Sequence, residues 1–460
     1  MTVSTTDTDK ALQKRIRGWM MFDFANQPFY TLMLTFIFGP YFASVAAEYY
    51  SGLGQETDQA SASAQSIWFW GQAASGLFIA FAAPIVGAHA DTTHSRMKWF
   101  WASALVYVLG TWALWYLTPD GAMLFVALAI FNVAFVASEF TLIFTNSMLP
   151  GLGPAKQVGK ISGNGLALGY VGGILSLFIM LFFIAEGDNG KTLLNISPIF
   201  GLDPDMREGT RAVGPFTAIW FMVFIIPFAL WVRDSKAPNR QGGMGQALRE
   251  LRISLAGAVQ RKSLFNFLIA SMLYRDGLNA LYAAGGLYAG LVLGWGVIEI
   301  GTFGIIAAFA AAIITYIGGF ADLHFGPKPV IQTNVIVLII VTTAMIGVNR
   351  HYFFGIPLVP ESTLPDIMLY VCGAAIGGAG GVLYSASRTM MVRHTNPDRP
   401  TEGFGLFALS GKATAFLAPM SIALVTWLTG NTQIGFTPVI ALLVAGLFLL
   451  RYVKPNGDQA

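Results

Sequence analysis

Two stretches of sequence, Gly87-Ala-His-Ala-Asp91 and Gly318-Gly-Phe-Ala-Asp322, decide the fold of this chain. Both have the form G-x-x-x-D, and both stand at the end of an apolar segment. Basic residues lie just beyond each copy: Arg96 and Lys98 after the first, and Lys328 after the second. The copies begin 231 residues apart in a chain of 460, so each half carries one. A signature repeated at half-length predicts two related halves packed around a shared axis, as in two-bundle transporters.

The composition indicates an integral membrane protein. Hydrophobic residues make up 55 % of the chain and charged residues only 11 %, whereas ordinary soluble domains carry about 25 % charged residues. The mean hydropathy is +0.61, and apolar stretches long enough to cross a bilayer recur along the chain. We predict twelve transmembrane helices, at residues 19–46, 65–89, 99–117, 122–149, 161–185, 214–232, 264–290, 297–321, 329–348, 366–387, 403–429 and 436–453.

The placement of basic residues predicts the orientation. Lys10, Lys14, Arg15 and Arg17 precede the first span, and the central loop carries several more. In contrast, the connections 47–64, 118–121 and 291–296 contain no Lys or Arg. The positive-inside rule then places both termini and the central loop in the cytoplasm of a multi-pass protein of the inner (plasma) membrane. The net charge of +3 follows from this topology and predicts no nucleic-acid partner.

The predicted organisation has five parts. These are a cytoplasmic N-terminus (1–18), an N-terminal six-helix bundle (19–232), a central loop (233–263), a C-terminal six-helix bundle (264–453) and a cytoplasmic tail (454–460). Apolar and basic residues alternate over 244–262, which predicts an interfacial amphipathic helix in the central loop. The fold class is therefore all-α, with two pseudo-symmetric bundles, and we expect a monomer in the lipid bilayer.

Several motifs, in order along the chain, carry a resemblance to a known family. They are Phe22–Tyr30 in the first span, Asn146–Pro150, Ser162–Gly173, Arg275–Gly277, Ser387-Arg388, Gly403–Gly405 and Gly411-Lys412. They resemble the major facilitator superfamily and, more narrowly, its vacuole-effluxer (autophagy-related amino-acid effluxer-like) branch, in a bacterial-type member. The resemblance implies export or uptake of a solute, with amino acids as the substrate class associated with the fungal members.

Five ionisable residues fall inside predicted spans: Asp23, Glu139, Arg275, Asp276 and Lys412. Each costs about 2.5–3.5 kcal/mol to insert, so each is a hypothesis of function. The pairs Asp23/Asn26 and Asp276/Asn279 repeat the pattern D-x-x-N on the first and seventh spans, with both members on one helix face. Substrate binding or ion coupling is therefore assigned to Asp23, Asn26, Glu139, Arg275, Asp276, Asn279 and Lys412.

Two interpretations of these charges stay open. Arg275 is expected to face Glu139 or a substrate carboxylate, and Lys412 to neutralise Asp276 or Asp23 or to bind an anion. The alternative is a set of static ion pairs that hold the halves in register. For a proton-coupled carrier, Glu139 and Asp276 are the candidate carboxylates, although the coupling ion could also be Na⁺.

The repeated signature predicts a cytoplasmic gate. An Asp at a helix end pairs with a basic residue or caps the N-terminus of a neighbouring helix, and glycine lets the helices approach closely. The predicted gate residues are Asp91, Arg96, Asp322, Lys328 and Arg388. The glycine series 165/169/173 and 373/377/381 recur every four residues, which favours close helix packing.

The sequence argues against other classes of function. The histidines show no metal-ligand spacing, and the glycine-rich run 377–381 follows no strand and precedes no Lys-Ser/Thr, so neither a metal nor a cofactor is expected. The loops are too short for a catalytic domain, so an enzyme is not predicted. Alternating-access transport of a small polar or zwitterionic organic solute, with proton coupling, is the preferred function. The alternatives are an uptake carrier for a vitamin or peptide-like nutrient and a non-transporting receptor or assembly factor on a transporter scaffold.

Overall fold

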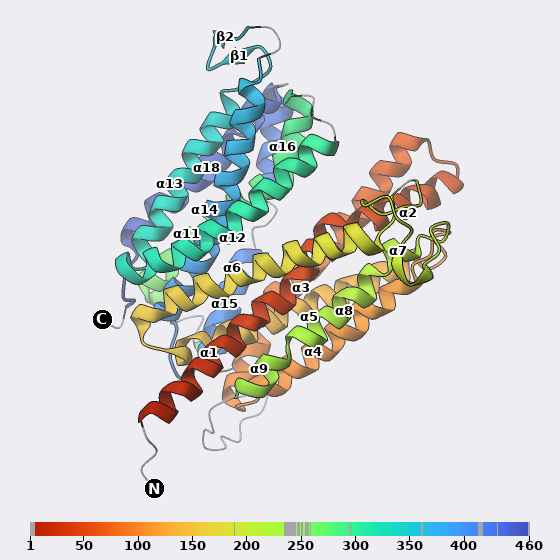
Figure 1. The fold of residues 1–460 in the computed structure, drawn as a ribbon. Helices are drawn as coiled ribbons and strands as arrows, with labels where there is room; N and C mark the ends of the chain where they lie inside the picture. Colours follow the sequence, from red (N-terminus) through yellow and green to blue (C-terminus); the bar gives the residue numbers. More distant parts are fainter. Residues whose placement is uncertain are drawn as a thin grey trace. The chain divides into compact units, whose positions relative to one another are not determined.

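The computed structural model is almost entirely helical (Figure 1). It describes residues 5–187, 189–233, 245, 249, 252–253, 257, 259–293, 295, 297–359, 362–412, 417–429 and 431–458. Within these residues the strands are confined to one antiparallel hairpin, β1 (Tyr352–Phe353) with β2 (Ile356–Pro357), which joins two long helices. The predicted amphipathic helix at 244–262 lies largely outside the described residues.

Each predicted span contains helix. In the first half the helices are α1 (Thr5–Pro28), η1 (Phe29–Phe36), α2 (Phe38–Gly52), α3 (Thr57–Thr92), α4 (Arg96–Ala113), η2 (Leu114–Tyr116), α5 (Leu124–Ser147), η3 (Leu149–Leu152), α6 (Ala155–Ile179), η4 (Met180–Ile184), η5 (Ile199–Gly201), α7 (Glu208–Arg211), α8 (Val213–Phe224) and α9 (Ile226–Trp231). In the second half they are α11 (Lys262–Leu293), α12 (Val297–Phe325), α13 (Pro327–Ile346), α14 (Leu364–His394), α15 (Pro400–Lys412), α16 (Leu417–Thr429), α17 (Thr432–Gly435), α18 (Thr437–Leu449) and η6 (Leu450–Tyr452).

Nine helical segments of the described chain are long and apolar enough to cross a membrane. The first span is interrupted, because the α-helix ends at Pro28 and continues as the π-helix η1. This break follows from the ring of Pro28, which has no N–H to donate and clashes with the preceding turn. Several helices run well past the predicted spans, as α3 and α14 do, since hydropathy detects only the apolar part of a helix.

The chain divides into two compact units. The first unit comprises residues 1–83, 93–146 and 168–240, and the second comprises 84–92, 147–167 and 241–460. The last turns of α3 and the first half of α6 therefore belong to the second unit. The two units are described separately below.

Glycine faces and aromatic rings build the first unit. A Cβ at Gly172 would lie 2.6 Å from the carbonyl oxygen of Phe24, and one at Gly173 would lie 2.5 Å from Thr31 Oγ1. The backbone of α6 therefore packs directly against α1, as the four-residue glycine series predicts. Beside this contact, Phe24 stacks on Trp220 of α8 with ring centroids 5.4 Å apart, and the indole N–H donates to the Phe24 carbonyl.

In the second unit, α12, α13 and α14 pack side by side, and α18 packs against α11 and α13 (Figure 1). Gly377 of α14 lies against the backbone of Ala307 in α12, so the glycine-rich run is a packing face. The C-terminal segment folds back onto this unit. The two carboxylate oxygens of Asp458 accept the N–H groups of Ser263 and Leu264, each at 3.1 Å, and thereby cap the first turn of α11.

The outer surfaces of the helices are apolar. Large side chains such as Phe81, Leu109, Ile313 and Val371 are more than half exposed. A contiguous apolar exterior of this kind is unfavourable in water and favourable in hydrocarbon. The surface thus agrees with the hydropathy of the sequence and with a membrane-spanning fold.

Candidate functional site

In the first unit, α1 and α5 bring two of the predicted residues into one polar cluster. Asn26 accepts a hydrogen bond from the hydroxyl of Ser138 (3.2 Å), and the next residue on α5, Glu139, accepts one from the hydroxyl of Tyr30 (3.4 Å). Asn26 and Glu139 are both buried. The break of the helix at Pro28 carries the chain into η1, which presents Tyr30 to Glu139.

Asp23 is also buried in the first unit, where its residue lies against Gly169 of α6. A Cβ at Gly169 would lie 3.1 Å from the Asp23 carbonyl oxygen and 3.3 Å from the Asp23 Cβ. Asp23 therefore stands at the α1–α6 contact. Neither this carboxylate nor Glu139 is isolated, because both make further polar interactions in the structure.

In the second unit, Arg275 of α11 is held by aromatic rings. Its guanidinium carbon lies 4.4 Å from the ring centroid of Phe407 and 5.7 Å from that of Tyr384. Its Nη1 donates to the Phe407 carbonyl oxygen at 3.3 Å, and Gly411 leaves room for the guanidinium. Among the described residues, no acceptor reaches its buried Nε. A guanidinium held in this way keeps hydrogen-bonding capacity for an anionic group.

Asp276, the next residue along α11, points to a different neighbour. Its Oδ2 accepts the backbone N–H of Ala418, in the first turn of α16, at 2.9 Å. Its Oδ1 has no hydrogen-bond donor within the described part of the chain, although the residue is only 3 % exposed. One turn further on, Asn279 accepts the hydroxyl of Tyr384 at 2.6 Å. This hydrogen bond orients the ring that lies beside Arg275.

The predicted set thus falls into two groups. Asp23, Asn26 and Glu139 belong to the first unit, and the α11 residues belong to the second. The fifth predicted charge-bearing residue, Lys412, ends α15, and its side chain lies outside what the structure describes. Neither Tyr384 nor Phe407 could be predicted from the sequence as a partner of Arg275, because their contacts depend on how α14 and α15 are rotated about their axes.

The first copy of the repeated signature contacts the start of α15. The carboxylate of Asp91 accepts the backbone N–H of Glu402 at 2.8 Å, two residues after α15 begins. A Cβ at Gly87 would lie 2.7 Å from the Thr401 carbonyl oxygen, so the glycine permits this close approach. An acidic group at a helix N-terminus is stabilised by the unpaired N–H groups there.

Arg388 binds the first half of α6. Its Nε donates to Ser162 Oγ (3.1 Å), and its Nη2 donates to the Ser162 carbonyl oxygen (2.9 Å). Ser385, one turn earlier on α14, donates to the same Ser162 hydroxyl at 3.0 Å. All three residues are buried. Ser162 and Ser385 are not among the predicted site residues, although Ser162 opens the family-like motif Ser162–Gly173.

The second copy of the signature has different surroundings. Asp322 is buried near the end of α12, where its carboxyl group packs onto the backbone of Gly159 in α6. Lys328, the basic residue that follows it, donates to the carbonyl oxygens of Val453 (2.8 Å) and Arg451 (3.4 Å). Arg96, in the first unit, begins α4 and makes polar interactions of its own.

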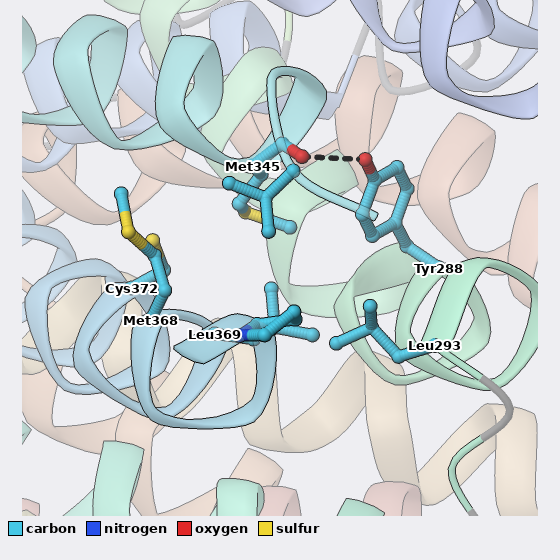
Figure 2. A pocket seen from close by; sticks show the side chains of 8 residues that line it. Tyr288, Leu293, Met345, Met368, Leu369 and Cys372 are labelled. Atoms are coloured by element: carbon cyan, nitrogen blue, oxygen red, sulfur yellow. Dashed lines mark hydrogen bonds between the residues drawn. The ribbon is translucent and has the colours of Figure 1, made fainter. Parts of the chain in front are cut away.

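An apolar cavity in the second unit does not coincide with these residues. It lies between α11, α13 and α14 and is lined by Tyr288, Leu293, Met345, Val348, Pro365, Met368, Leu369 and Cys372 (Figure 2). Its polar group, the hydroxyl of Tyr288, already donates to the Met345 carbonyl oxygen at 2.6 Å. Because this lining is otherwise apolar and its hydroxyl is already bonded, we assign the cavity no part in the recognition of a polar solute. Within the described residues no cluster of three metal-ligating side chains occurs.

This chain is similar to one family model and to several known proteins. Residues 153–457 match the family described as vacuole effluxer Atg22 like. The chain is 24 % identical over 454 residues to the uncharacterized MFS-type transporter YxiO of Bacillus subtilis (strain 168), covering 96 % of each chain. It is also 23 % identical over 303 residues to autophagy-related protein 22 of Cryptococcus neoformans var. neoformans serotype D (strain JEC21 / ATCC MYA-565). That match spans only 50 % of the fungal protein.

Solved structures of similar fold are transporters. The proton:xylose symporter XylE matches with a TM-score of 0.69 and 13 % identity, over 98 % of this chain and 97 % of the symporter. FucP, crystallised in the outward conformation, matches with a TM-score of 0.65 and 13 % identity, over 96 % of this chain and 98 % of FucP. At such low identity these similarities establish the fold alone.

Proposed function

This chain belongs to the vacuole effluxer Atg22-like family of major facilitator transporters, and on that premise we propose that it moves a small polar or zwitterionic organic solute by proton-coupled alternating access. It is a membrane transporter and not an enzyme. Amino acids are the substrate class to test first, because relatives include proteins of the family named for vacuolar efflux. The orientation inferred from the basic residues puts both termini in the cytoplasm.

The observation that carries the proposal is the pair Arg275 and Asp276 on α11. The guanidinium of Arg275 lies against two aromatic rings and has a buried Nε without an acceptor among the described residues. Asp276 has one buried carboxylate oxygen without a donor, again within the described chain. Buried polar groups normally find partners, so unpartnered atoms on adjacent residues favour a ligand role. Arg275 would bind the carboxylate of the solute, and Asp276 would exchange the proton.

The first unit holds a second set of candidate binding groups. Asn26 and Glu139 lie together there, and their amide and carboxylate groups suit an ammonium or hydroxyl group. Glu139 remains the other candidate for the coupled proton.

The same proposal assigns the cytoplasmic gate to Asp91, Arg96, Asp322, Lys328 and Arg388. Its support is local: Asp91 caps the start of α15, and Arg388 binds Ser162 of α6. Both contacts join helix ends from opposite halves of the sequence. Alternating access would require such contacts to break and re-form in each transport cycle.

The decisive experiment is flux into proteoliposomes with a labelled amino-acid mixture and an imposed pH gradient. We expect the wild-type protein to accumulate some component of the mixture against its gradient. Asp276→Asn should abolish this accumulation but retain exchange of labelled for unlabelled solute. The reason is that the asparagine oxygen can still accept the N–H of Ala418, whereas the amide cannot carry the proton.

A matched control removes an acid that takes no part in the mechanism. Asp120 lies in the exposed loop between η2 and α5, where the hydroxyl of Thr118 and then the N–H of Ala122 hold its pKa below the usual range. Asp120 therefore stays ionised throughout the assay range, and Asp120→Asn should transport like the wild type. Accumulation that persists in Asp276→Asn would reject Asp276 as the coupling residue.

The same assay tests the substrate class. If correctly folded wild-type protein moves no amino acid, the assignment taken from the family is wrong, and vitamins or peptide-like nutrients become the next solutes to test. Arg275→Gln should impair the transport of solutes that bear a carboxylate more than that of their amide analogues. Equal impairment of both would show that Arg275 does not bind the solute carboxylate.

A further inference from the structure

The two copies of the repeated signature end in the same residue type but differ in chemistry. Asp91 accepts a backbone N–H at the start of α15 and makes further polar interactions. Asp322 has no hydrogen-bond donor to either carboxylate oxygen among the described residues, and it is only 3 % exposed. The first acid is therefore placed to be stabilised as an anion, whereas the second is not.

The reason lies in what packs on Asp322. Gly159 of α6 has no side chain, and the carboxyl group of Asp322 fills the space above its backbone so tightly that a Cβ there would overlap the carboxyl carbon. Next along the same two helices, Gly163 meets Gly319 backbone to backbone. We refer to this surface, in which Gly159 and Gly163 of α6 pack on Asp322 and Gly319 of α12, as the α6–α12 contact. While it is closed, the carboxyl group is enclosed by packed backbone.

The basic groups near Asp322 donate no hydrogen bond to its carboxylate oxygens, although the buried Nε of Arg393 has no partner among the described residues. Arg393 of α14 lies close enough for an electrostatic interaction, but its Nη1 donates to Pro455 and Asn456 of the C-terminal segment. Lys160 of α6 lies over the ring of Phe320, at 4.7 Å from its centroid.

The remaining polar neighbours are satisfied as well. Arg388 of α14 binds Ser162, Lys328 of α13 binds the Val453 carbonyl, and His324 on α12 itself binds the Phe320 carbonyl. The hydroxyl of Thr389 on α14 donates to the carbonyl oxygen of Ser385 at 3.3 Å, and it lies close enough to Asp322 to interact with its carboxyl group as well. Within the described chain, then, Arg393 acts on Asp322 from a distance, but no group forms an ion pair or hydrogen bond with its carboxylate oxygens.

An ionised carboxylate that is buried without donors is strongly unfavourable, and the neutral acid costs far less. We propose that Asp322 is a proton-binding site of this protein, which takes up a proton when the α6–α12 contact closes and releases it to water when the contact opens. The proton comes from the solution at that end of the helices and returns to the same side. This site is separate from Asp276 and Glu139, and it operates whether or not a solute is bound.

The sign of the pH dependence follows from linkage. Because the closed contact binds one proton more than the open contact, acid favours closure and alkali favours opening. For a single proton the closed-to-open ratio changes by up to about tenfold per pH unit, and the change levels off once the open form is also protonated. By the predicted orientation, the pH sensed in this way is that of the cytoplasm.

A cysteine reporter can measure opening. Thr315 of α12 is 0 % exposed, its carbonyl oxygen lies at Gly163, and no acceptor within the described residues reaches its hydroxyl. Thr315→Cys is thus a conservative change in a buried position of the contact. With the native Cys372 replaced by Ser, the alkylation rate of this thiol in nanodiscs reports how often the contact opens. The exposed Ser51→Cys, alkylated in the same way, corrects for the pH dependence of thiol reactivity.

The corrected alkylation rate of the wild-type background should rise with pH above about pH 4, where an exposed aspartate ionises, and should level off once the enclosed acid ionises too. Asp322→Asn, which imitates the protonated acid, should give a slow and pH-independent rate. Gly159→Ala, which displaces the carboxyl group into water, should give a fast and pH-independent rate. Asp91→Asn, the matched change in the first copy, should keep the pH dependence whatever it does to the absolute rate.

Proton binding at Asp322 predicts that Asp322→Asn lowers the alkylation rate, that Gly159→Ala raises it, and that both variants lose the pH dependence. A purely structural role of Asp322 predicts instead that both variants open the contact and keep the pH dependence. A corrected wild-type rate that does not change with pH, or a pH dependence that survives in Asp322→Asn, overturns the proposal. Infrared difference spectra give a second measurement if Asp322→Asn folds poorly. A protonated carboxyl band that appears as the pH is lowered must then persist in Asp276→Asn and appear only at lower pH in Asp322→Glu/Gly159→Ala, where the acid reaches water. Because neither assay contains a solute, its outcome does not depend on the transport proposal.

Discussion

The closest backbone approach in the α6–α12 contact makes a quantitative prediction for Gly163→Ala. A Cβ at Gly163 would lie 2.5 Å from Gly319 Cα, 2.9 Å from Gly319 N and 3.1 Å from the Thr315 carbonyl oxygen. All of these atoms belong to the backbone, so no side-chain rotation relieves the overlap. The two helices must separate, and the closed contact is destabilised relative to the open one.

Overpacking of this kind costs about 1–3 kcal/mol. A free-energy difference of that size corresponds to roughly a 5–150-fold change in an equilibrium constant. Gly163→Ala should therefore raise the alkylation rate of the Thr315→Cys reporter by a factor in that range, measured at a single pH. The factor applies while opening and closing remain fast relative to alkylation, since the rate then follows the open fraction.

The matched control is Gly76→Ala in α3, where an added Cβ meets nothing within 4 Å. Alanine favours a helix over glycine by about 1 kcal/mol, so this variant should be at least as stable as the wild type and should leave reporter alkylation unchanged. If Gly163→Ala also leaves it unchanged, the helices at Gly163 and Gly319 do not pack as tightly as the structure indicates, and the reasoning is refuted.

Two further substitutions test contacts elsewhere. Gly411→Ala would place a Cβ 2.5 Å from Arg275 Nη2, so the guanidinium must shift. The KM for the transported solute, measured by proteoliposome flux, should then rise more than kcat falls. An unchanged KM would show that Arg275 takes no part in binding. Glu186→Ala removes the acceptor of the Thr210 hydroxyl (2.6 Å) and of the Thr210 N–H. Leaving these buried donors unpaired should destabilise the protein by about 1–3 kcal/mol, seen as a lower thermal unfolding midpoint in detergent with substrate selectivity intact.

Much of the fold could be predicted because it depends on local sequence. Apolar length alone locates the spans, since a helix must satisfy its backbone within the bilayer. Pro28 ends α1 for a reason intrinsic to its ring. The four-residue spacing of Gly169 and Gly173 predicts a packing face, and that face indeed receives α1. Each of these inferences needs only the residue and its neighbours in sequence.

The partners of the buried polar groups could not be predicted in the same way. Arg388 binds Ser162, which is 226 positions away, and Arg275 contacts Phe407, which is 132 positions away. Such contacts depend on the rotation of each helix about its axis, which a hydropathy pattern does not determine. Lys328 shows the same limit, because its nearness in sequence to Asp322 suggests an ion pair, whereas its amino group binds carbonyl oxygens of the C-terminal segment.

The repeat itself explains why two identical signatures have acquired different surroundings. A G-x-x-x-D sequence ensures only that a helix ends with an acid near a small residue, so that a second helix can approach. In the first copy the approaching element is the N-terminus of α15, whose free N–H groups stabilise an anion. In the second it is the backbone of Gly159 in α6, which packs on the carboxyl group of Asp322 but donates no hydrogen bond to it. The same motif therefore gives a charged contact in one half and an enclosed acid in the other. The two related signatures can therefore take different roles: Asp91 caps a helix N-terminus, whereas Asp322 makes the closure of the α6–α12 contact depend on protons.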